Sequence, residues 1–306
     1  EEAARTVLGQ CGADALAPAD DPDGQAPLPF AAAVDYARTA MAWAREPLPS
    51  SVAVAADQAY GLDRLQRFDV YAPQGARAAP VLVFWHGGGW TNGYRQWVRF
   101  MAPQVTRLGL VLVAPSYRLA PEHPLPMAID DTCQLLQTLT RRLPEWGGAA
   151  DRLYLSGHSA GAHLASMAAI ACSRAGQRWL PEGAVRACLP ISGIMDLHAS
   201  APAPGSLEER VYTHVLRGLD TSQDVVLSPL YWTAGLRLPF DLSVGEHDSE
   251  RVRRSNRRMQ ALLAAQQAPV TLEEWPGRNH FDTHLDLRDP EHPWYRRLMD
   301  RVQSTA

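Results

Sequence analysis

Lysine is absent from this chain, and all 29 basic residues among its 306 are arginines. Catalysis through a lysine amine, such as Schiff-base chemistry, is therefore excluded. The same absence excludes a phosphate-binding loop of the Walker type, which requires lysine. The stretch "GHSAGA" (residues 157–162) does not match the glycine spacing of a dinucleotide-binding turn, so no nucleotide cofactor is predicted.

Cysteine and net charge are both low. Four widely spaced cysteines without a C-x-x-C pair argue against a zinc site or a disulfide framework and favour buried free thiols, although one bridge is left open (Cys11, Cys133, Cys172 and Cys188). The formal net charge of -4 gives no electrostatic reason to expect nucleic acid or an anionic membrane as a partner. The oligomeric state is left open, a homodimer included.

Long apolar segments are missing as well. No run approaches the roughly 20 residues of a membrane-spanning helix, and the acidic opening "EEAARTVLGQCG" lacks the apolar core of a secretion signal. We therefore expect a soluble cytoplasmic protein. Residues 1 to about 28 are rich in Ala, Asp, Pro and Gly, which indicates a loop or a mobile arm.

Short apolar runs alternate with segments of helical periodicity along most of the chain. Continuous apolar runs are typical of strands buried on both faces, so we predict an α/β fold with a mostly parallel central sheet and helices on both faces. The first helix would cover the carboxyl edge of the sheet as a small cap, because ligand sites of such sheets lie there. The predicted strands are 67–73, 80–85, 109–115, 152–157, 185–191, 238–244 and 269–275, and the predicted helices are 30–45, 96–108, 127–143, 159–174, 249–267 and 294–302.

The stretch "LSGHSAGAH" (residues 155–163) contains the G-x-S-x-G pattern around Ser159. The serine lies where a predicted buried strand ends and a predicted helix begins, which is the context of a nucleophile displayed on a sharp turn. Gly157 and Gly161 remove the side chains that would collide at such a crossing. The pattern alone is a weak signal, because two glycines around a serine also suit an ordinary tight turn.

A serine nucleophile requires a base, and the base is usually a histidine oriented by a carboxylate. "SVGEHDSE" supplies Asp248 and "WPGRNHFD" supplies His280, each on a loop that leaves the carboxyl end of a predicted strand. Glu246 competes with Asp248 for the carboxylate role. The order serine, aspartate, histidine is the one expected of this architecture.

A glycine run offers donors for an oxyanion. "WHGGGW" (residues 85–90) follows a predicted strand, and the amides of Gly87, Gly88 and Gly89, together with that of Ala160, are the candidates. We expect His86 to brace this loop through a hydrogen bond.

Three aromatic residues near these loops are candidates for a substrate pocket, although core packing explains them equally well: Trp90, Tyr94 and Phe281. The basic segment "RVRRSNRRM" (251–259) indicates the solvated face of a helix. His280 and His284 have a spacing that a metal site could use, but no further ligands cluster with them, so no metal is predicted.

These motifs together resemble the α/β-hydrolase superfamily, in particular the hormone-sensitive-lipase-like esterases and the kynurenine formamidases. The carrying stretches, over about residues 60–285, are "FDVYAP", "FWHGGGW", "YRLAPEHPLP", "SGHSAGAHLA", "ISGIMDL", "LSP", "GEHDSE" with "RRSNRRM", and "NHFD". "SGIMDL", "HDSE" and "HFD" are more similar to the formamidases, whereas Gly89 in the hole motif resembles the esterase pattern.

The resemblance implies an α/β-hydrolase domain over residues 61–306. Residues 1–60 match no part of the family pattern, and their composition and periodicity predict an arm and a cap helix. It implies a carboxylesterase or an arylformamidase that needs no cofactor and acts on a small acyl ester or an aryl formamide. The alternative is a hydrolase-fold protein that binds a small molecule without catalysis. The presence of Ser159, Asp248 and His280 together favours the enzyme.

Overall fold

The computed structural model describes residues 25, 27–174 and 180–304. The predicted arm over residues 1 to about 28 therefore falls mostly outside the described residues. Eight strands form a single sheet in the described part of the chain, in the order β1-β2-β4-β3-β5-β6-β7-β8. The strands are β1 (Val52–Ala59), β2 (Arg67–Pro73), β3 (Ala79–Trp85), β4 (Val111–Pro115), β5 (Gly148–His158), β6 (Val185–Ile191), β7 (Phe240–His247) and β8 (Val270–Asn279).

The sheet is parallel from β4 to β8, and β2 runs antiparallel to both of its neighbours, β1 and β4. The predicted mostly parallel α/β sheet is confirmed. Every predicted strand is present, with small differences in bounds. The sequence analysis missed β1, an edge strand of Val, Ala, Asp and Gln in which only Val52 is buried. Without a continuous apolar run, an edge strand leaves little signal.

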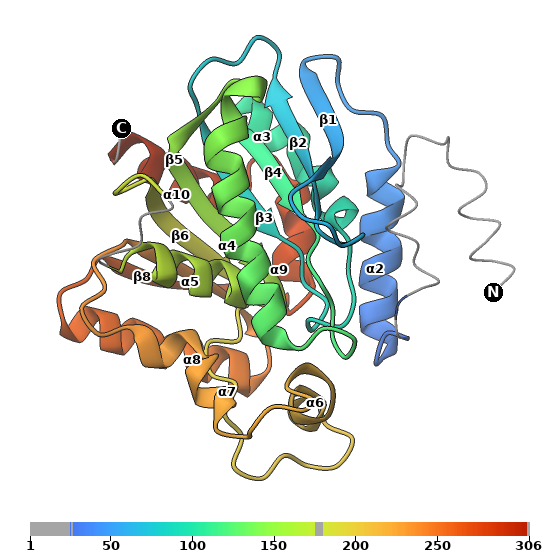
Figure 1. Ribbon diagram of the computed structural model, residues 1–306, viewed down its shortest axis with the longest axis vertical. Coiled ribbons are helices and arrows are strands. Elements are labelled where there is room, and N and C mark those ends of the chain that lie inside the picture. The colour runs from blue at the N-terminus through green and yellow to red at the C-terminus, as the bar shows by residue number, and fades with distance from the viewer. Residues whose placement is uncertain (1–24, 26, 175–179, 305–306) are drawn as a thin grey trace, which may run out of the picture.

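Helices cover both faces of the sheet (Figure 1). The α-helices are α2 (Ala31–Ala44), α3 (Ala102–Arg107), α4 (Leu125–Arg142), α5 (Ala160–Cys172), α6 (Leu207–Arg210), α7 (Gln223–Val226), α8 (Glu250–Ala265), α9 (Asp282–Leu285) and α10 (Pro293–Ser304). Tighter or wider turns are η3 (Arg95–Met101), η4 (Leu143–Trp146), η5 (Val211–Val215), η6 (Pro229–Trp232) and η7 (Asp286–Arg288).

The predicted helix over 96–108 is wrong as a single α-helix. The segment is the 3-10 turn η3 followed by the short helix α3, which has Pro103 in its first turn. Proline has no amide hydrogen to donate, so the hydrogen-bonding pattern is interrupted there.

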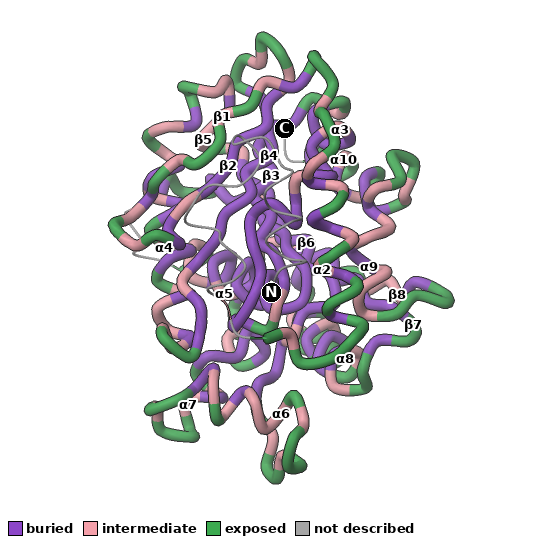
Figure 2. Tube along the Cα trace, turned by 90° about the vertical axis from the view of Figure 1, so that its right-hand side faces the viewer, coloured by how far each residue is buried: buried purple, intermediate pink, exposed green. Residues whose placement is uncertain are grey.

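The core has two layers, because successive side chains of a strand point to opposite faces of the sheet. In β3, Val81 and Val83 belong to the cluster that includes side chains of α4, α5 and α8, whereas Leu82 and Phe84 belong to the cluster with α3 and α10. Figure 2 shows the central strands buried and the exposed residues collected at the periphery. Burial on both faces explains why these strands are continuously apolar in sequence.

Helix α2 packs beside the loop that follows β3. Its buried residues are Ala33, Tyr36, Ala40, Met41 and Ala44, which recur at helical spacing. Tyr36 packs edge to face on Trp97 of η3, with ring centroids 5.2 Å apart. The helix thereby brings the N-terminal part of the chain to the carboxyl edge of the sheet.

Candidate active site

Three side chains of the candidate site each come first after a strand. Ser159 follows β5, Asp248 follows β7 and His280 follows β8. These strands are parallel in the sheet, so their carboxyl ends lie on one edge and bring the three residues together. Their separation in sequence is therefore no obstacle to contact.

The turn at Ser159 has strained backbone and very close packing. Ser159 has φ 56° and ψ -118°, a conformation that side-chain-bearing residues rarely adopt. A Cβ on Gly157 would lie 2.5 Å from the carbonyl carbon of Gly161, and a Cβ on Gly161 would lie 2.1 Å from the Trp85 oxygen. Only glycine fits either position, so the pattern around the serine serves the crossing of strand and helix as well as the display of the hydroxyl.

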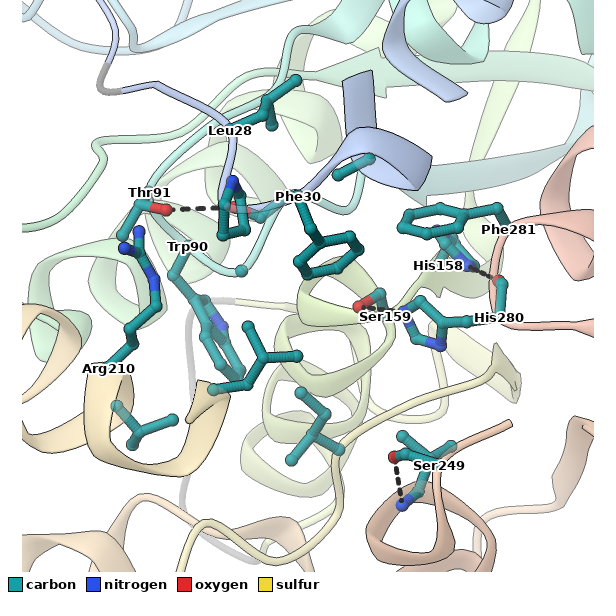
Figure 3. A pocket seen from close by; sticks show the side chains of 18 of the residues that line it. Leu28, Phe30, Trp90, Thr91, His158, Ser159, Arg210, Ser249, His280 and Phe281 are labelled. Atoms are coloured by element: carbon teal, nitrogen blue, oxygen red, sulfur yellow. Dashed lines mark hydrogen bonds between the residues drawn. The ribbon is translucent and has the colours of Figure 1, made fainter. Parts of the chain in front are cut away.

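Two hydrogen bonds connect the three side chains (Figure 3 shows the one between Ser159 and His280). Ser159 Oγ lies 2.8 Å from His280 Nε2, and His280 Nδ1 lies 2.6 Å from Asp248 Oδ1. Asp248 is buried, and the side chain of His280 is 27% exposed. An imidazole that donates from Nδ1 to the carboxylate presents a bare Nε2 to the serine hydroxyl, which is the arrangement that lets it accept a proton.

The Asp248 carboxylate is fully engaged. Its Oδ2 accepts hydrogen bonds from the Ser192 hydroxyl at 2.6 Å and from the Gly245 amide at 2.8 Å. Burial alone would raise the pKa of Asp248, but the hydrogen bonds from His280, Ser192 and Gly245 hold that pKa below its ordinary value. The carboxylate is therefore ionised at neutral pH.

Glu246, the competing carboxylate of the sequence analysis, lies elsewhere. It is exposed, and its Oε2 accepts the amide hydrogen of Gly277 at 2.7 Å. Of these two carboxylates, only Asp248 contacts His280.

A buried histidine supports the main chain of His280. His158 donates from Nε2 to the His280 carbonyl at 2.7 Å, and the Thr283 hydroxyl is 2.8 Å from the same oxygen. The His158 ring stacks on that of His284, with centroids 5.2 Å apart, and His284 Nδ1 is 2.7 Å from the Tyr36 hydroxyl. Nothing in the sequence pattern indicates that His158 meets this carbonyl, so only the structure reveals the contact.

Four buried histidines predict instability in acid. Burial lowers the pKa of His86 and of His163 to about 4 and that of His284 to about 3; burial and then the neighbouring His280 and His284 lower that of His158 well below its ordinary value. The folded protein keeps these rings neutral, whereas the unfolded chain binds protons below about pH 6.5.

The contribution of these rings to the free energy of unfolding is therefore fully present above pH 6.5. It decreases as the pH drops toward the folded pKa values, with a slope of about 1.4 kcal/mol per pH unit for each titrating ring. Urea unfolding between pH 7.5 and pH 4.5 measures this slope. His163 donates from Nε2 to the Leu227 carbonyl at 2.7 Å, so His163→Gln keeps a donor there and should remove one ring's share of the slope. A free energy of unfolding that stays constant down to pH 5 would contradict the prediction.

The glycine loop after β3 faces the serine. Gly88 and Gly89 line the cavity described below, whereas Gly87 and Ala160 are not among its lining residues. His86 Nδ1 donates to the Gly87 carbonyl at 2.7 Å, as expected for a residue that braces this loop. Within the described residues, no acceptor is recorded for the Gly88 or Gly89 amide, so both are available to a bound oxygen.

A cavity of about 300 Å³ opens over Ser159. Most of its wall is apolar, and two of the three aromatic candidates, Trp90 and Phe281, belong to it. Tyr94 does not: its buried ring packs edge to face on Trp97, which lines the cavity in its place. Further lining residues, which the sequence analysis missed, are Leu28, Phe30, Tyr36, Ile194, Leu207, Val211 and Val215.

One arginine of the segment 251–259 also departs from expectation. Arg251 lines the cavity, and its side chain is only 16% exposed. It donates to the carbonyls of Asp196 and Leu197. The prediction of a solvated helix face is therefore wrong for this residue, because the first turn of α8 begins at the cavity wall.

Cys133, Cys172 and Cys188 carry free thiols, and Cys11 lies outside the described residues. His284, whose spacing from His280 allowed a metal site, is fully buried against Tyr36 and Phe84. Among the described residues, no group of three or more His, Cys, Asp or Glu side chains could hold a metal ion. The same residues include no helix of the length and apolarity that crossing a membrane requires.

The model of a known family, the alpha/beta hydrolase fold, matches residues 82–283. This chain belongs to the α/β hydrolase fold family. The resemblance expected from the motifs is thereby confirmed. The matched residues include Ser159, Asp248 and His280.

The relatives of this α/β hydrolase are named for two kinds of activity, formamidase and esterase. It is 28% identical to a kynurenine formamidase of Salmo salar over 242 residues, which are 76% of each chain. It is 32% identical to a probable isoprenylcysteine alpha-carbonyl methylesterase of Arabidopsis thaliana over 108 residues, 35% of this chain and 23% of the relative. Both comparisons support a hydrolase.

The fold also recurs in solved structures. Esterase B from Lactobacillus rhamnosis has a TM-score of 0.72 and 23% identity, over 90% of this chain and 91% of the other. An esterase from Pyrobaculum calidifontis has a TM-score of 0.72 and 20% identity, over 89% and 93% respectively. At these identities the likeness establishes the architecture alone.

Proposed function

We propose that this α/β hydrolase is a serine esterase that cleaves small acyl esters through an acyl-enzyme. The observation that carries the proposal is the unbroken pair of hydrogen bonds from Ser159 through His280 to Asp248 at the floor of an apolar cavity. A protein that only binds a ligand has no use for this arrangement, whereas acyl transfer depends on it.

In the proposed reaction, Ser159 Oγ attacks the acyl carbon while His280 Nε2 takes its proton. His280 then gives that proton to the leaving alcohol as the ester C–O bond breaks, and the acyl group stays on the serine. A water molecule, deprotonated by the same imidazole, releases the acid. Asp248 holds the Nδ1–H tautomer and stabilises the imidazolium in each step.

The negative charge on the acyl oxygen needs donors. We assign this role to the amides of the glycine loop, Gly88 and Gly89 foremost because they line the cavity, and to the Ala160 amide at the start of α5. Gly87 is the remaining candidate of the loop. Each correctly placed donor lowers the barrier by about 3 kcal/mol.

The extent of the cavity favours an ester with an acyl chain longer than formyl. Trp90, Ile194 and Val215 belong to its apolar wall, and contact with apolar surface stabilises a bound methylene by about 0.8 kcal/mol. We propose that α2 acts as a cap, because Ala33 and Tyr36 of this helix line the cavity.

An aryl formamide is the second candidate substrate. Phe281 follows His280 and packs near Phe30 and Tyr36, with ring centroids 6.0 and 5.1 Å apart. This cluster offers an aromatic leaving group a surface on which to stack beside the proton donor. The relative named as a kynurenine formamidase supports the same candidate.

Side-by-side turnover of 4-nitrophenyl acetate, 4-nitrophenyl hexanoate and N-formylkynurenine tests the proposal. We expect both esters to be hydrolysed, and mass spectrometry of a quenched reaction to find the acyl group on the peptide that contains Ser159. Turnover of N-formylkynurenine alone would select the formamidase. Binding of all three compounds without acylation or product would favour the non-catalytic alternative and overturn the proposal.

A further inference from the structure

The apolar cavity has a charged side, formed by Glu208, Arg210 and Arg251. Two of these charges are committed to protein partners. Arg251 donates from Nη2 to the Leu197 carbonyl at 2.7 Å, and its Nη1 lies 3.7 Å from Glu208 Oε1. The charges of this pair offset each other, so Arg210 leaves the cavity wall with one uncompensated positive charge.

Arg210 differs from most arginines around it. It is half-buried at the end of α6, and no ion pair or side-chain hydrogen bond to any other described residue is recorded for its guanidinium. On α8, by contrast, Arg253, Arg257 and Arg258 all pair with carboxylates. An arginine fork at an apolar wall, where water screens charge poorly, matches the geometry of a carboxylate.

The position of Arg210 indicates which part of a substrate it would meet. In Figure 3, Arg210 and Trp90 lie on one side of Ser159, and His280 and Phe281 lie on the other. The leaving group must be next to His280 Nε2, because that atom supplies its proton. The opposite side is then left to the acyl chain.

We propose that Arg210 is a specificity-determining residue that binds a carboxylate at the far end of the acyl chain. The substrate class is a monoester of an aliphatic dicarboxylic acid: the chain methylenes contact the apolar wall, and the free carboxylate pairs with Arg210. The inference rests on the proposed esterase function. Hydrolysis forms the Ser159–acyl bond, expels the alcohol with the proton from His280, and after attack by water releases the dicarboxylate.

Two isosteric esters test the assignment: mono-4-nitrophenyl adipate and 4-nitrophenyl hexanoate, which differ by a carboxylate in place of a methyl group. The 4-nitrophenyl monoesters of suberic and sebacic acid have longer chains, which place the carboxylate further from the ester group. Shorter succinate and glutarate monoesters are avoided because they cyclise to anhydrides without an enzyme. We expect the best dicarboxylate monoester to have a higher kcat/KM than the neutral ester of the same chain length. Arg210→Met should lower the ratio of these two kcat/KM values about 10- to 100-fold. Arg210→Lys should retain part of the ratio, because it keeps the charge without the fork.

Arg217→Met is the matched control. Arg217 is exposed on the same segment and is not among the cavity residues, so its replacement makes the same change in net charge and should leave the ratio intact. An equal loss in both methionine variants would mean long-range attraction and overturn the subsite. In 4-(hexanoyloxy)benzoate the carboxylate is on the leaving group instead of the acyl chain. If the wild type prefers this compound to its methyl ester and Arg210→Met abolishes that preference, the assignment of Arg210 to the acyl side is overturned.

Failure of the two proposals can be told apart. Wild-type protein that hydrolyses hexanoate but shows no Arg210-dependent preference for any dicarboxylate overturns the subsite and leaves the esterase standing. Wild-type protein that hydrolyses neither ester overturns the esterase, and the subsite with it.

Discussion

Replacing Ser159 with alanine is expected to lower kcat/KM for 4-nitrophenyl hexanoate by about 10⁵-fold or more. The hydroxyl is the proposed nucleophile, and it lies 2.8 Å from His280 Nε2. Among the side chains that line the cavity, Ser159 is the one whose hydroxyl is hydrogen-bonded to His280, so the change removes the group that this base would activate. Initial rates at saturating and subsaturating ester, corrected for spontaneous hydrolysis, measure the loss.

A double variant makes this experiment specific. If Ser159 and His280 act as one unit, adding His280→Gln to Ser159→Ala should cost little more than the first change alone. Circular dichroism and thermal unfolding of each variant exclude a folding defect as the cause. Near-wild-type turnover by Ser159→Ala would mean that the glycines around residue 159 form only a turn.

The second large effect is expected at the carboxylate. Asp248→Asn should lower kcat by about 10⁴-fold. An asparagine can turn its oxygen toward the Ser192 and Gly245 donors and its amide toward His280 Nδ1. That choice selects the tautomer with hydrogen on Nε2, which cannot accept the proton of Ser159.

Glu246→Gln is the matched control for this change. It removes the same charge two residues away, and a glutamine oxygen can still accept the Gly277 amide. We expect activity within about two-fold of wild type, as for most exposed sites outside the chemistry. The reverse result, with Glu246→Gln inactive and Asp248→Asn active, would assign the carboxylate role to Glu246. Equal, small effects of both changes would remove the carboxylate from the mechanism.

Much of the fold follows from the sequence because burial on both faces leaves a direct signal. The apolar stretches that became β3, β5 and β6 needed no knowledge of their neighbours. The edge strand β1 lacked that signal. So did the segment from α6 to η6, whose short helices and turns depend on contacts with distant residues rather than on an amphipathic repeat.

The candidate site divides in the same way. Ser159, Asp248 and His280 could be predicted because each follows a strand, and parallel strands end on one edge. The cavity wall could not. Tyr36 reaches it from a helix far upstream, and Val215 reaches it from the irregular segment after β6. Neither residue belongs to a local motif, so only the tertiary structure places them.

Because Ser159, Asp248 and His280 follow β5, β7 and β8, the proposed catalytic site can be assembled only late in the synthesis of the chain. His280 joins Ser159 only after β8 has paired with β7, about 120 positions further along the polypeptide. A ribosome-bound chain that has emerged only as far as α8 contains the proposed nucleophile, Ser159, but lacks the proposed base, His280. If the proposed esterase function holds, the onset of ester hydrolysis during synthesis would report when β8 pairs with β7. A chain released before that point would have no esterase activity, even if the strands up to β7 had folded.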